Sequence, residues 1–556
     1  MKTTNTFLPL LLVIFFLDFD IRSGEVPVNY YTSSFDTAVN IQENSIPWFI
    51  REEIKNFENS NQIKIDGMRI FGNKYISDLY KGVEYRPVWT HSKNTADLLT
   101  ILEESYYEGL NPDDYHLDFI KNHLELSDKM EPKVMATLDI LMTDAILTYA
   151  FHMVQGKVNP SSFDSNWNYH ERPMPDDVDF RLLNRLQTKT LNETIDFLRP
   201  EMPLYHELQE KFVLLDSMKK VGGEIQQLEY PGNALKPGVK SPAVSALKDH
   251  MKNYGYVFEH PEEDLYDEEL EEAVKDFQMI TGLETDGICG KGTYKALNIP
   301  LAERLDIIRV NMERCRWMNN TLPEKFILVN IADYNLYIFR NNDIEYKCRV
   351  VVGKEFNKTP VFSSDIKYVV FNPTWTVPYS IASKEMLPKL KKDSNYLQNR
   401  NMTLLRGNEV INPSTVDFKQ YSQNNFPYTI RQEPGPNNAL GLVKFIFPNN
   451  YAVYLHDTPS KSFFERTDRA FSHGCVRVKD PLILAEELLY DQGYDSEKIK
   501  EVIQSKKLKN VYLTEPMPVM IMYWTCYVDD QDGRIRFFRD VYGRDKKVLQ
   551  ELKKKR

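Results

Sequence analysis

The spacing of apolar residues changes near residue 325, and this change constrains the fold more than any other feature of the chain. Before it, segments such as 134–155 and 203–220 repeat apolar side chains at helical spacing. After it, short runs rich in Val, Ile, Tyr and Phe, such as 326–331 and 334–339, are separated by turn residues and predict strands. A chain of 556 residues has room for two to four domains. We therefore expect a multidomain α+β protein.

Pro- and Gly-rich residues between 230 and 242 mark the first domain boundary. Residues 28–230 are predicted to form a helical scaffold. Residues 235–299 are predicted to form a compact three-helix unit, with Thr293 as the N-cap of its last helix.

A mainly β domain is expected over residues 324–510. Within it, residues 384–392 predict a short helix that Pro388 kinks, and the polar segment of about 395–438 lacks periodicity. A segment this long is typical of a functional lid or loop. Residues 511–556 are expected to supply closing strands and a basic tail that pack on this domain.

The N-terminus has the features of an export signal. Lys2 precedes an apolar run at 7–17, which is shorter than the roughly 20 residues of a membrane-spanning helix. We expect a signal peptide or an N-terminal membrane anchor within residues 1–23, and an exported protein. No later segment is expected to be apolar enough to span a bilayer.

Charge and cysteine content exclude several classes of protein. The formal net charge of −11 argues against nucleic-acid binding. The five Cys residues show no CxxC spacing, so no zinc site and no other metal or cofactor is predicted. Their odd number leaves at least one free thiol in an exported protein, and a single Cys315–Cys348 bridge stays open.

One of these thiols, Cys475, has two histidines that could act on it. A thiol is a good nucleophile when a base can remove its proton. A strand ending at Leu455 would bring His456 close to Cys475, and His473 is two residues away, so either imidazole could be the base. A buried Cys with two incidental histidines is the alternative.

Neighbouring residues could complete a catalytic site. The backbone carbonyl of Asp457 or its carboxylate could orient the His456 imidazole. The amides of Gly474 and Cys475 could form an oxyanion hole. Arg477 could bind a substrate carboxylate, and its charge favours the thiolate.

These residues belong to two segments, 454–458 and 471–478, which resemble the signature of the L,D-transpeptidase catalytic domain, or YkuD fold. Further segments resemble the large exported branch of that family: 309–317, 352–354, 358–362, 371–378, 384–388 and 438–445. The residues from 266 to 298 resemble a small peptidoglycan-binding module, with a purely structural spacer as the alternative.

The resemblance assigns a role to each residue of the site. It implies Cys475 as the acylated nucleophile and His456 as its base. It also implies that the Asp457 backbone carbonyl orients the imidazole and that the Gly474 amide binds the oxyanion, while His473 supports the loop. The residues expected at the substrate are Arg477, Tyr454, Trp375 and Ser472, with the lid of about 395–438 over the donor groove.

The implied fold is a helical scaffold, a three-helix peptidoglycan-binding module and a mainly β catalytic domain with a long lid insertion. The implied reaction joins peptidoglycan stem peptides, as donor and acceptor, in the periplasm or cell envelope. Cys475 attacks the amide before a terminal D-alanine, and the side-chain amine of a neighbouring stem collects the acyl group. The protein is expected to be a monomer without a cofactor.

Other functions remain open on the sequence alone. Attack by water on the same thioester would make the protein an L,D-carboxypeptidase, and attack by a protein lysine would tether a lipoprotein. A noncatalytic wall-binding scaffold is the alternative from another class. A papain-like protease fits poorly, because its Cys opens a helix near the mature N-terminus.

Overall fold

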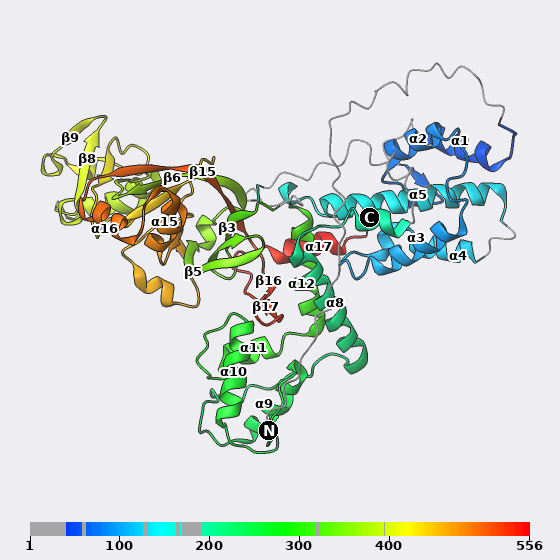
Figure 1. Ribbon diagram of the computed structural model, residues 1–556, viewed down its shortest axis with the longest axis horizontal. Helices are drawn as coiled ribbons and strands as arrows, with labels where there is room; N and C mark the ends of the chain where they lie inside the picture. Colours follow the sequence, from blue (N-terminus) through cyan, green and yellow to red (C-terminus); the bar gives the residue numbers. More distant parts are fainter. Residues whose placement is uncertain are drawn as a thin grey trace.

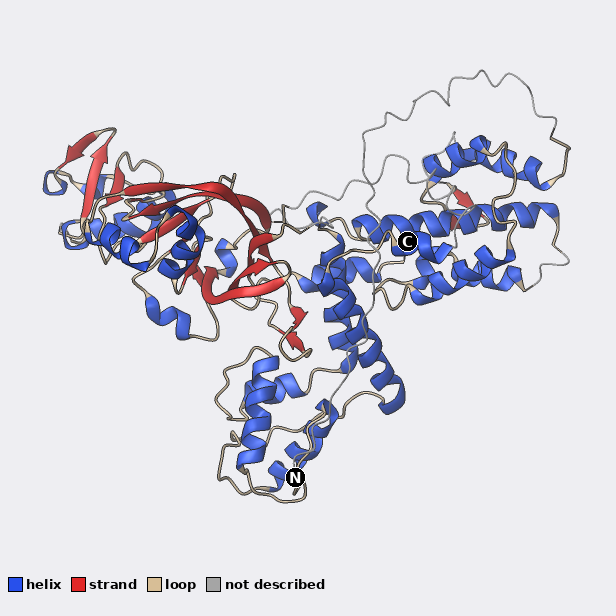
Figure 2. Cartoon of the chain, viewed as in Figure 1, coloured by secondary structure: helices blue, strands red, loops and turns tan. Residues whose placement is uncertain are grey.

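The computed structural model describes residues 41–57, 63–125, 130–162, 167–168, 191–318, 322–393 and 395–555. The predicted signal peptide or anchor in residues 1–23 lies outside this part of the chain. Three lobes meet around helix α12 (Leu301–Arg316), which lies in the middle of the molecule (Figure 1). Two of the lobes are helical, and strands are concentrated in the third (Figure 2).

The N-terminal helical lobe is built around α5 (Pro132–Gln155). The elements that pack on it are α1 (Ile46–Phe57), α2 (Asn73–Gly82), α3 (Ser92–Glu104), η1 (Pro112–Tyr115) and α4 (Leu117–Leu124). The other elements before the three-helix unit are β1 (Lys64–Ile65), β2 (Met68–Arg69), η3 (Pro160–Ser162), α7 (Leu191–Asp196), which contacts α3, and α8 (Pro203–Gly222), which packs on α12. Two buried carboxylates of α5 hold the surrounding chain. Asp144 accepts hydrogen bonds from the amides of Phe71 and Gly72, and Asp139 accepts from those of Val88 and Trp89.

Among the described residues, α5 is the one helix long and apolar enough to cross a membrane by length and composition. The expectation that no segment after the N-terminus meets this test was therefore wrong. However, 83% of its most apolar window is buried inside the lobe. Its apolar surface on all sides is that of a core helix surrounded by protein.

The three-helix unit has a hydrophobic core of its own. Its helices are α9 (Pro242–Met251), α10 (Glu268–Ile280) and α11 (Lys291–Leu297), with the short η4 (Lys252–Tyr254) after α9. The prediction that Thr293 is the N-cap was wrong, because α11 begins at Lys291 and Gly290 is its N-cap. Thr293 is buried inside the unit, within 3.3 Å of the Gln278 side-chain amide.

The third lobe contains a sheet of nine strands that closes on itself. Their order is β13-β5-β14-β12-β11-β6-β15-β3-β4, and β4 also pairs with β5. Their bounds are β3 (Lys325–Asn330), β4 (Asn335–Arg340), β5 (Asp343–Gly353), β6 (Phe362–Phe371), β11 (Val443–Ile446), β12 (Leu455–His456), β13 (Ala470–Ser472), β14 (Val476–Val478) and β15 (Lys509–Met522). Helices α15 (Pro481–Leu489) and α16 (Ser496–Gln504) belong to the same hydrophobic core. The predicted multidomain α+β fold is confirmed.

The polar segment predicted as a lid or loop is part of a larger folded unit between β6 and β11, here called the lid (residues 375–432). Its four-stranded sheet has the order β7-β10-β8-β9. Its elements are β7 (Trp375–Thr376), α13 (Tyr379–Ile381), the π-helix η6 (Ala382–Met386), α14 (Leu387–Leu390), η7 (Gln398–Arg400), β8 (Met402–Arg406), β9 (Glu409–Ile411), η8 (Pro413–Thr415), η9 (Phe418–Gln420) and β10 (Thr429–Gln432).

The lid has its own core, which includes Leu404, Phe418 and Ile430. These apolar residues are too irregularly spaced to give a helical or strand period. The helix predicted over 384–392 starts earlier, and a π turn precedes Pro388. Such a turn accommodates a residue without an amide hydrogen in a continuous helical segment.

The C-terminal residues do not all pack as predicted. Strand β15 belongs to the nine-stranded sheet, but β16 (Cys526–Val528) and β17 (Ile535–Phe537) form a separate hairpin. Helix α17 (Asp545–Lys553) packs on α12. At its end, the buried ammonium of Lys157 donates to the carbonyls of Leu552 and Lys554. The basic tail is therefore held by the N-terminal lobe.

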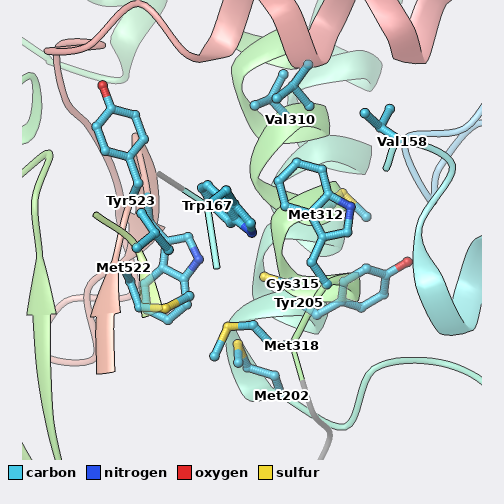
Figure 3. Packing of buried hydrophobic residues seen from close by; sticks show 14 of the residues in the cluster. Val158, Trp167, Met202, Tyr205, Val310, Met312, Cys315, Met318, Met522 and Tyr523 are labelled. Carbon is cyan, nitrogen blue, oxygen red and sulfur yellow. The ribbon is translucent and has the colours of Figure 1, made fainter. Parts of the chain in front are cut away.

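Helix α12 joins the lobes through a buried charged cluster and apolar contacts. Glu313 accepts from the Val158 amide at 2.7 Å and from Arg316 at 2.8 Å. Arg316 also donates to the Tyr205 hydroxyl at 2.9 Å. Gly156, with φ +84°, allows this approach, since a Cβ there would lie 2.7 Å from Glu313 Oε1. Figure 3 shows the apolar part, where Val310, Met312 and Cys315 lie among Val158, Trp167, Tyr205, Met522 and Tyr523.

Candidate active site

The pairing of two short strands brings the predicted catalytic residues together. Strands β12 and β14 are parallel, with Leu455 opposite Val476 and His456 opposite Arg477. Because side chains alternate along a strand, this register directs His456 and Arg477 to one face. Tyr454 and Cys475 directly precede Leu455 and Val476, so they belong to the same face as His456 and Arg477. Leu455 and Val476 point into the hydrophobic core.

His456 is held as a neutral imidazole. Its Nδ1 lies 2.5 Å from the backbone carbonyl of Asp457, and since a carbonyl only accepts, Nδ1 carries the hydrogen. The Nε2 lone pair is thus free to take a proton. The pKa of His456 is lowered to about 3, mainly by burial and in smaller part by the charges of Arg477 and Lys444, while the hydrogen bond to the Asp457 carbonyl opposes this shift.

The carboxylate of Asp457 is directed away from the imidazole. It accepts hydrogen bonds from the amides of Thr458 and Leu442 and from Lys461 Nζ, at 2.7, 2.8 and 2.6 Å. Gly441, with φ +62°, makes room for it, because a Cβ there would lie 2.2 Å from Asp457 Oδ2. Of the two groups that the sequence left open, the backbone carbonyl is the one that contacts His456.

Cys475 is a half-buried, protonated thiol. Burial raises its pKa above the ordinary range, against the lowering effects of Tyr454 and Arg477. Its Sγ donates to the Ala452 carbonyl at 3.7 Å. The positive charge of Arg477 therefore favours the thiolate as expected, but burial outweighs it.

The loop before Cys475 is held by internal hydrogen bonds. Ser472 Oγ donates to the Cys475 carbonyl at 2.5 Å and accepts from the Gly474 amide at 3.1 Å. Thr359 Oγ1 donates to the Gly474 carbonyl at 2.9 Å. The Gly474 amide, expected in the oxyanion hole, is thus occupied. Ser472, expected at the substrate, is 2% exposed and shapes the loop instead.

The other predicted residues lie around this loop. His473 Nε2 lies 2.8 Å from Glu385 Oε1 on the π-helix η6, so its imidazole is directed to the lid rather than to the thiol. The Tyr454 ring centroid lies 5.5 Å from that of His456, and burial with the neighbouring Cys475 raises the Tyr454 pKa. Trp375 is half-buried on β7, opposite Gln432.

Arg477 and Lys444 flank His456 as two unneutralised cations. Lys444 on β11 is opposite His456, while Arg477 is opposite it on β14. Neither cation forms an ion pair within the described residues, and Arg477 Nε is buried without a hydrogen-bond partner. The sequence did not point to Lys444. Its only signal is the alternation with the buried Val443 and Phe445, which becomes informative once the register with β12 is known.

The other cysteines are separate from this site. Cys289, Cys315, Cys348 and Cys526 are free and buried, so the bridge left open between Cys315 and Cys348 is not formed. Over the described part of the chain, no group of three or more His, Cys, Asp or Glu side chains could hold a metal ion.

Comparison with protein-family models identifies the lobe that carries this site. Residues 324–503 match the model described as "L,D-transpeptidase catalytic domain". This part of the chain is therefore similar to L,D-transpeptidase catalytic domains. Residues 74–212 match a "Scaffold domain", and residues 240–297 match a "Putative peptidoglycan binding domain". The order of domains inferred from the family resemblance is confirmed.

Two curated proteins are similar to parts of the chain. A protein of Haemophilus influenzae named "Putative L,D-transpeptidase" is 38% identical over 224 residues, which span 40% of this chain and 45% of that protein. The "N-acetylmuramoyl-L-alanine amidase CwlM" of Mycobacterium tuberculosis is 38% identical over 76 residues, which span 12% of this chain and 18% of that protein. The chain thus matches less than half the length of either relative.

Solved structures include a crystal structure of the L,D-transpeptidase from Xylanimonas cellulosilytica. The similarity covers 53% of this chain and 100% of that chain at 15% identity, with a TM-score of 0.18. The similarity to L,D-transpeptidases lies in residues 324–503, which match the family model, and in the 224 residues aligned with the Haemophilus influenzae protein.

Proposed function

We propose that this protein is a peptidoglycan L,D-transpeptidase whose nucleophile is Cys475. The observation that carries the proposal is the parallel register of β12 and β14, because it brings His456 and Cys475 to one face of the catalytic domain. The neutral imidazole and the protonated thiol are the starting states that general-base catalysis requires.

The first half-reaction forms a thioester. His456 Nε2 takes the thiol proton while Cys475 Sγ bonds to the carbonyl carbon before the terminal D-alanine. The C–N bond then breaks, its electron pair goes to the nitrogen, and the imidazolium returns the proton to that nitrogen. No acceptor for the Cys475 amide is found within the described residues, so this amide is free to donate to the developing oxyanion.

The second half-reaction transfers the acyl group to the side-chain amine of the third residue in a neighbouring stem. The amine attacks the thioester carbon, and its proton passes through His456 to the departing sulfur. The lid approaches the catalytic loop through the Glu385–His473 contact, so donor and acceptor would enter around it. Trp375 and Tyr454 would line the donor groove. A wall substrate and the export signal expected in residues 1–23 together imply a periplasmic or envelope location.

Mass spectrometry of the intact protein tests the nucleophile. Cys475→Ala incubated with a disaccharide-tetrapeptide should gain no acyl adduct, whereas the wild type should gain the mass of the donor minus D-alanine. Cys289→Ala, which removes a buried thiol of the three-helix unit, is the matched control and should acylate normally. Acylation of Cys475→Ala would refute the mechanism.

Analysis of the soluble products tests the acceptor. Cross-linked dimers are expected from transpeptidation. Tripeptide monomers alone would instead identify an L,D-carboxypeptidase that hydrolyses the same thioester.

A further inference from the structure

Lys444 lies beside the predicted base in a row of three side chains across the sheet. The strand order is β14, β12, β11, and the registers pair Arg477 with His456 and His456 with Lys444. Directly paired residues share a face, so the two cations stand on either side of the imidazole. Neighbouring strands are about 4.8 Å apart, so both charged side chains lie close enough to act on the imidazole.

Both cations lack a protein counterion, although neither is fully exposed. Lys444 is half-buried, and its Nζ lies 5.8 Å from the centroid of the Tyr454 ring. The carboxylate of Asp457, the residue after His456, is already bound by Lys461 and two amides. Partly buried charges are normally paired, since desolvation without a partner is costly. The row therefore offers a site for an anion.

The proposed reaction, on which this inference rests, brings a carboxylate to this point. The nitrogen of the departing D-alanine must lie at His456 Nε2 to receive the proton. Its carboxylate carbon is attached to the same Cα, about 2.5 Å from that nitrogen by standard backbone geometry. The terminal carboxylate of the donor would consequently lie within a few ångströms of His456, which the two cations flank.

We propose that Lys444 and Arg477 together bind the terminal carboxylate of the departing D-alanine, and that Lys444 makes the enzyme select donors with a free C-terminus. Two charged donors converging on one carboxylate fix the leaving group relative to His456. An amidated or longer donor would leave both cations unpaired.

The test compares acylation by a tetrapeptide donor with a free C-terminal carboxylate and by the same donor as its C-terminal amide. The wild type should acylate about 10- to 100-fold faster with the free acid, the usual range for a charge-assisted hydrogen bond. Lys444→Met should reduce this preference by about tenfold, mainly through slower reaction of the free acid. Lys444→Arg should retain most of it. Any change in the basicity of His456 affects both donors and cancels in the ratio.

Lys367→Met is the matched control, because Lys367 is an exposed lysine of β6 outside the row, and it should keep the wild-type preference. Equal slowing of Lys444→Met on both donors, or an unchanged preference, would overturn the role of Lys444. Equal acylation rates of the wild type with the two donors would also overturn the role of Lys444. This comparison needs no variant, so it holds even if Lys444→Met fails to fold. A wild type that forms no acyl-enzyme with either donor would instead refute the proposed function.

Discussion

At the scale of single residues, the two predicted catalytic partners are both uncharged at rest. Burial lowers the pKa of His456 to about 3 and raises the pKa of Cys475. A preformed thiolate–imidazolium pair is therefore disfavoured, and the proton has to move during attack. This differs from thiol enzymes in which the cysteine is already ionised.

Removal of the charge of Arg477 should raise the pKa of His456. The sign follows from electrostatics, since a neighbouring cation disfavours the imidazolium and its loss stabilises that form. In Arg477→Gln labelled with ¹³C-histidine, the His456 resonance should titrate at a higher pH than in the wild type, where it should stay neutral well below pH 5. His456→Gln assigns the resonance, and Lys367→Met is the control. An unchanged titration would show that Arg477 does not act on the imidazole.

The site shows where sequence reasoning works and where it stops. The sequence predicts a strand that ends at Leu455 and a chain return that brings His456 close to Cys475. The register between β12 and β14 depends on hydrogen bonds between strands that are distant in the sequence. No local sequence pattern encodes this register. Lys444 was missed for this reason. The state of the Gly474 amide depends on a side-chain rotamer of Ser472, which the sequence does not specify.

At the scale of elements, the lid is a folding unit rather than a loop. Its core is separate from that of the nine-stranded sheet. The polar composition of 395–438 concealed this core, because part of it comes from 377–390, before the polar segment. The helical periods of α5 and α8 were long and regular, and both helices were predicted close to their observed bounds.

Leu404→Ala should unfold the lid locally and leave the sheet intact. Leu404 is fully buried in the lid core, and truncation of such a residue costs about 2–5 kcal/mol. Hydrogen exchange should accelerate in β8 and β10 but not in β11 and β12. Val410→Ala, at a position that is 66% exposed, should change neither. Equal acceleration of hydrogen exchange in both sheets would mean that the lid and the nine-stranded sheet unfold together.

At the scale of the whole molecule, α12 holds the lobes together through charges inside the protein. Its Arg314, Arg316 and Glu313 are fully buried, although their residue types are normally exposed. Arg314 pairs with Asp545 of α17, and Arg316 pairs with Glu313. The charged composition of α12 would by itself predict a surface helix. Its burial follows from the packing of the three lobes around it.

Arg316→Met should destabilise the protein by about 3–5 kcal/mol, because it leaves the buried charge of Glu313 uncompensated. Urea denaturation measures this loss. Arg340→Met, which removes an exposed ion pair with Glu345, should cost less than about 1 kcal/mol. Similar losses in the two variants would mean that the buried pair adds nothing beyond a surface one.

The way the lid joins the nine-stranded sheet has a consequence for how such proteins can diversify. Its first strand, β7, is hydrogen-bonded to its last strand, β10, with Trp375 opposite Gln432 and Thr376 opposite Arg431. The two junctions between the lid and the nine-stranded sheet are thereby fixed side by side, whatever chain lies between β7 and β10. A different lid could therefore replace this one between the paired strands β7 and β10 with little added cost in chain entropy. The residues of the sheet and the shape of the lid can thus evolve as separate modules.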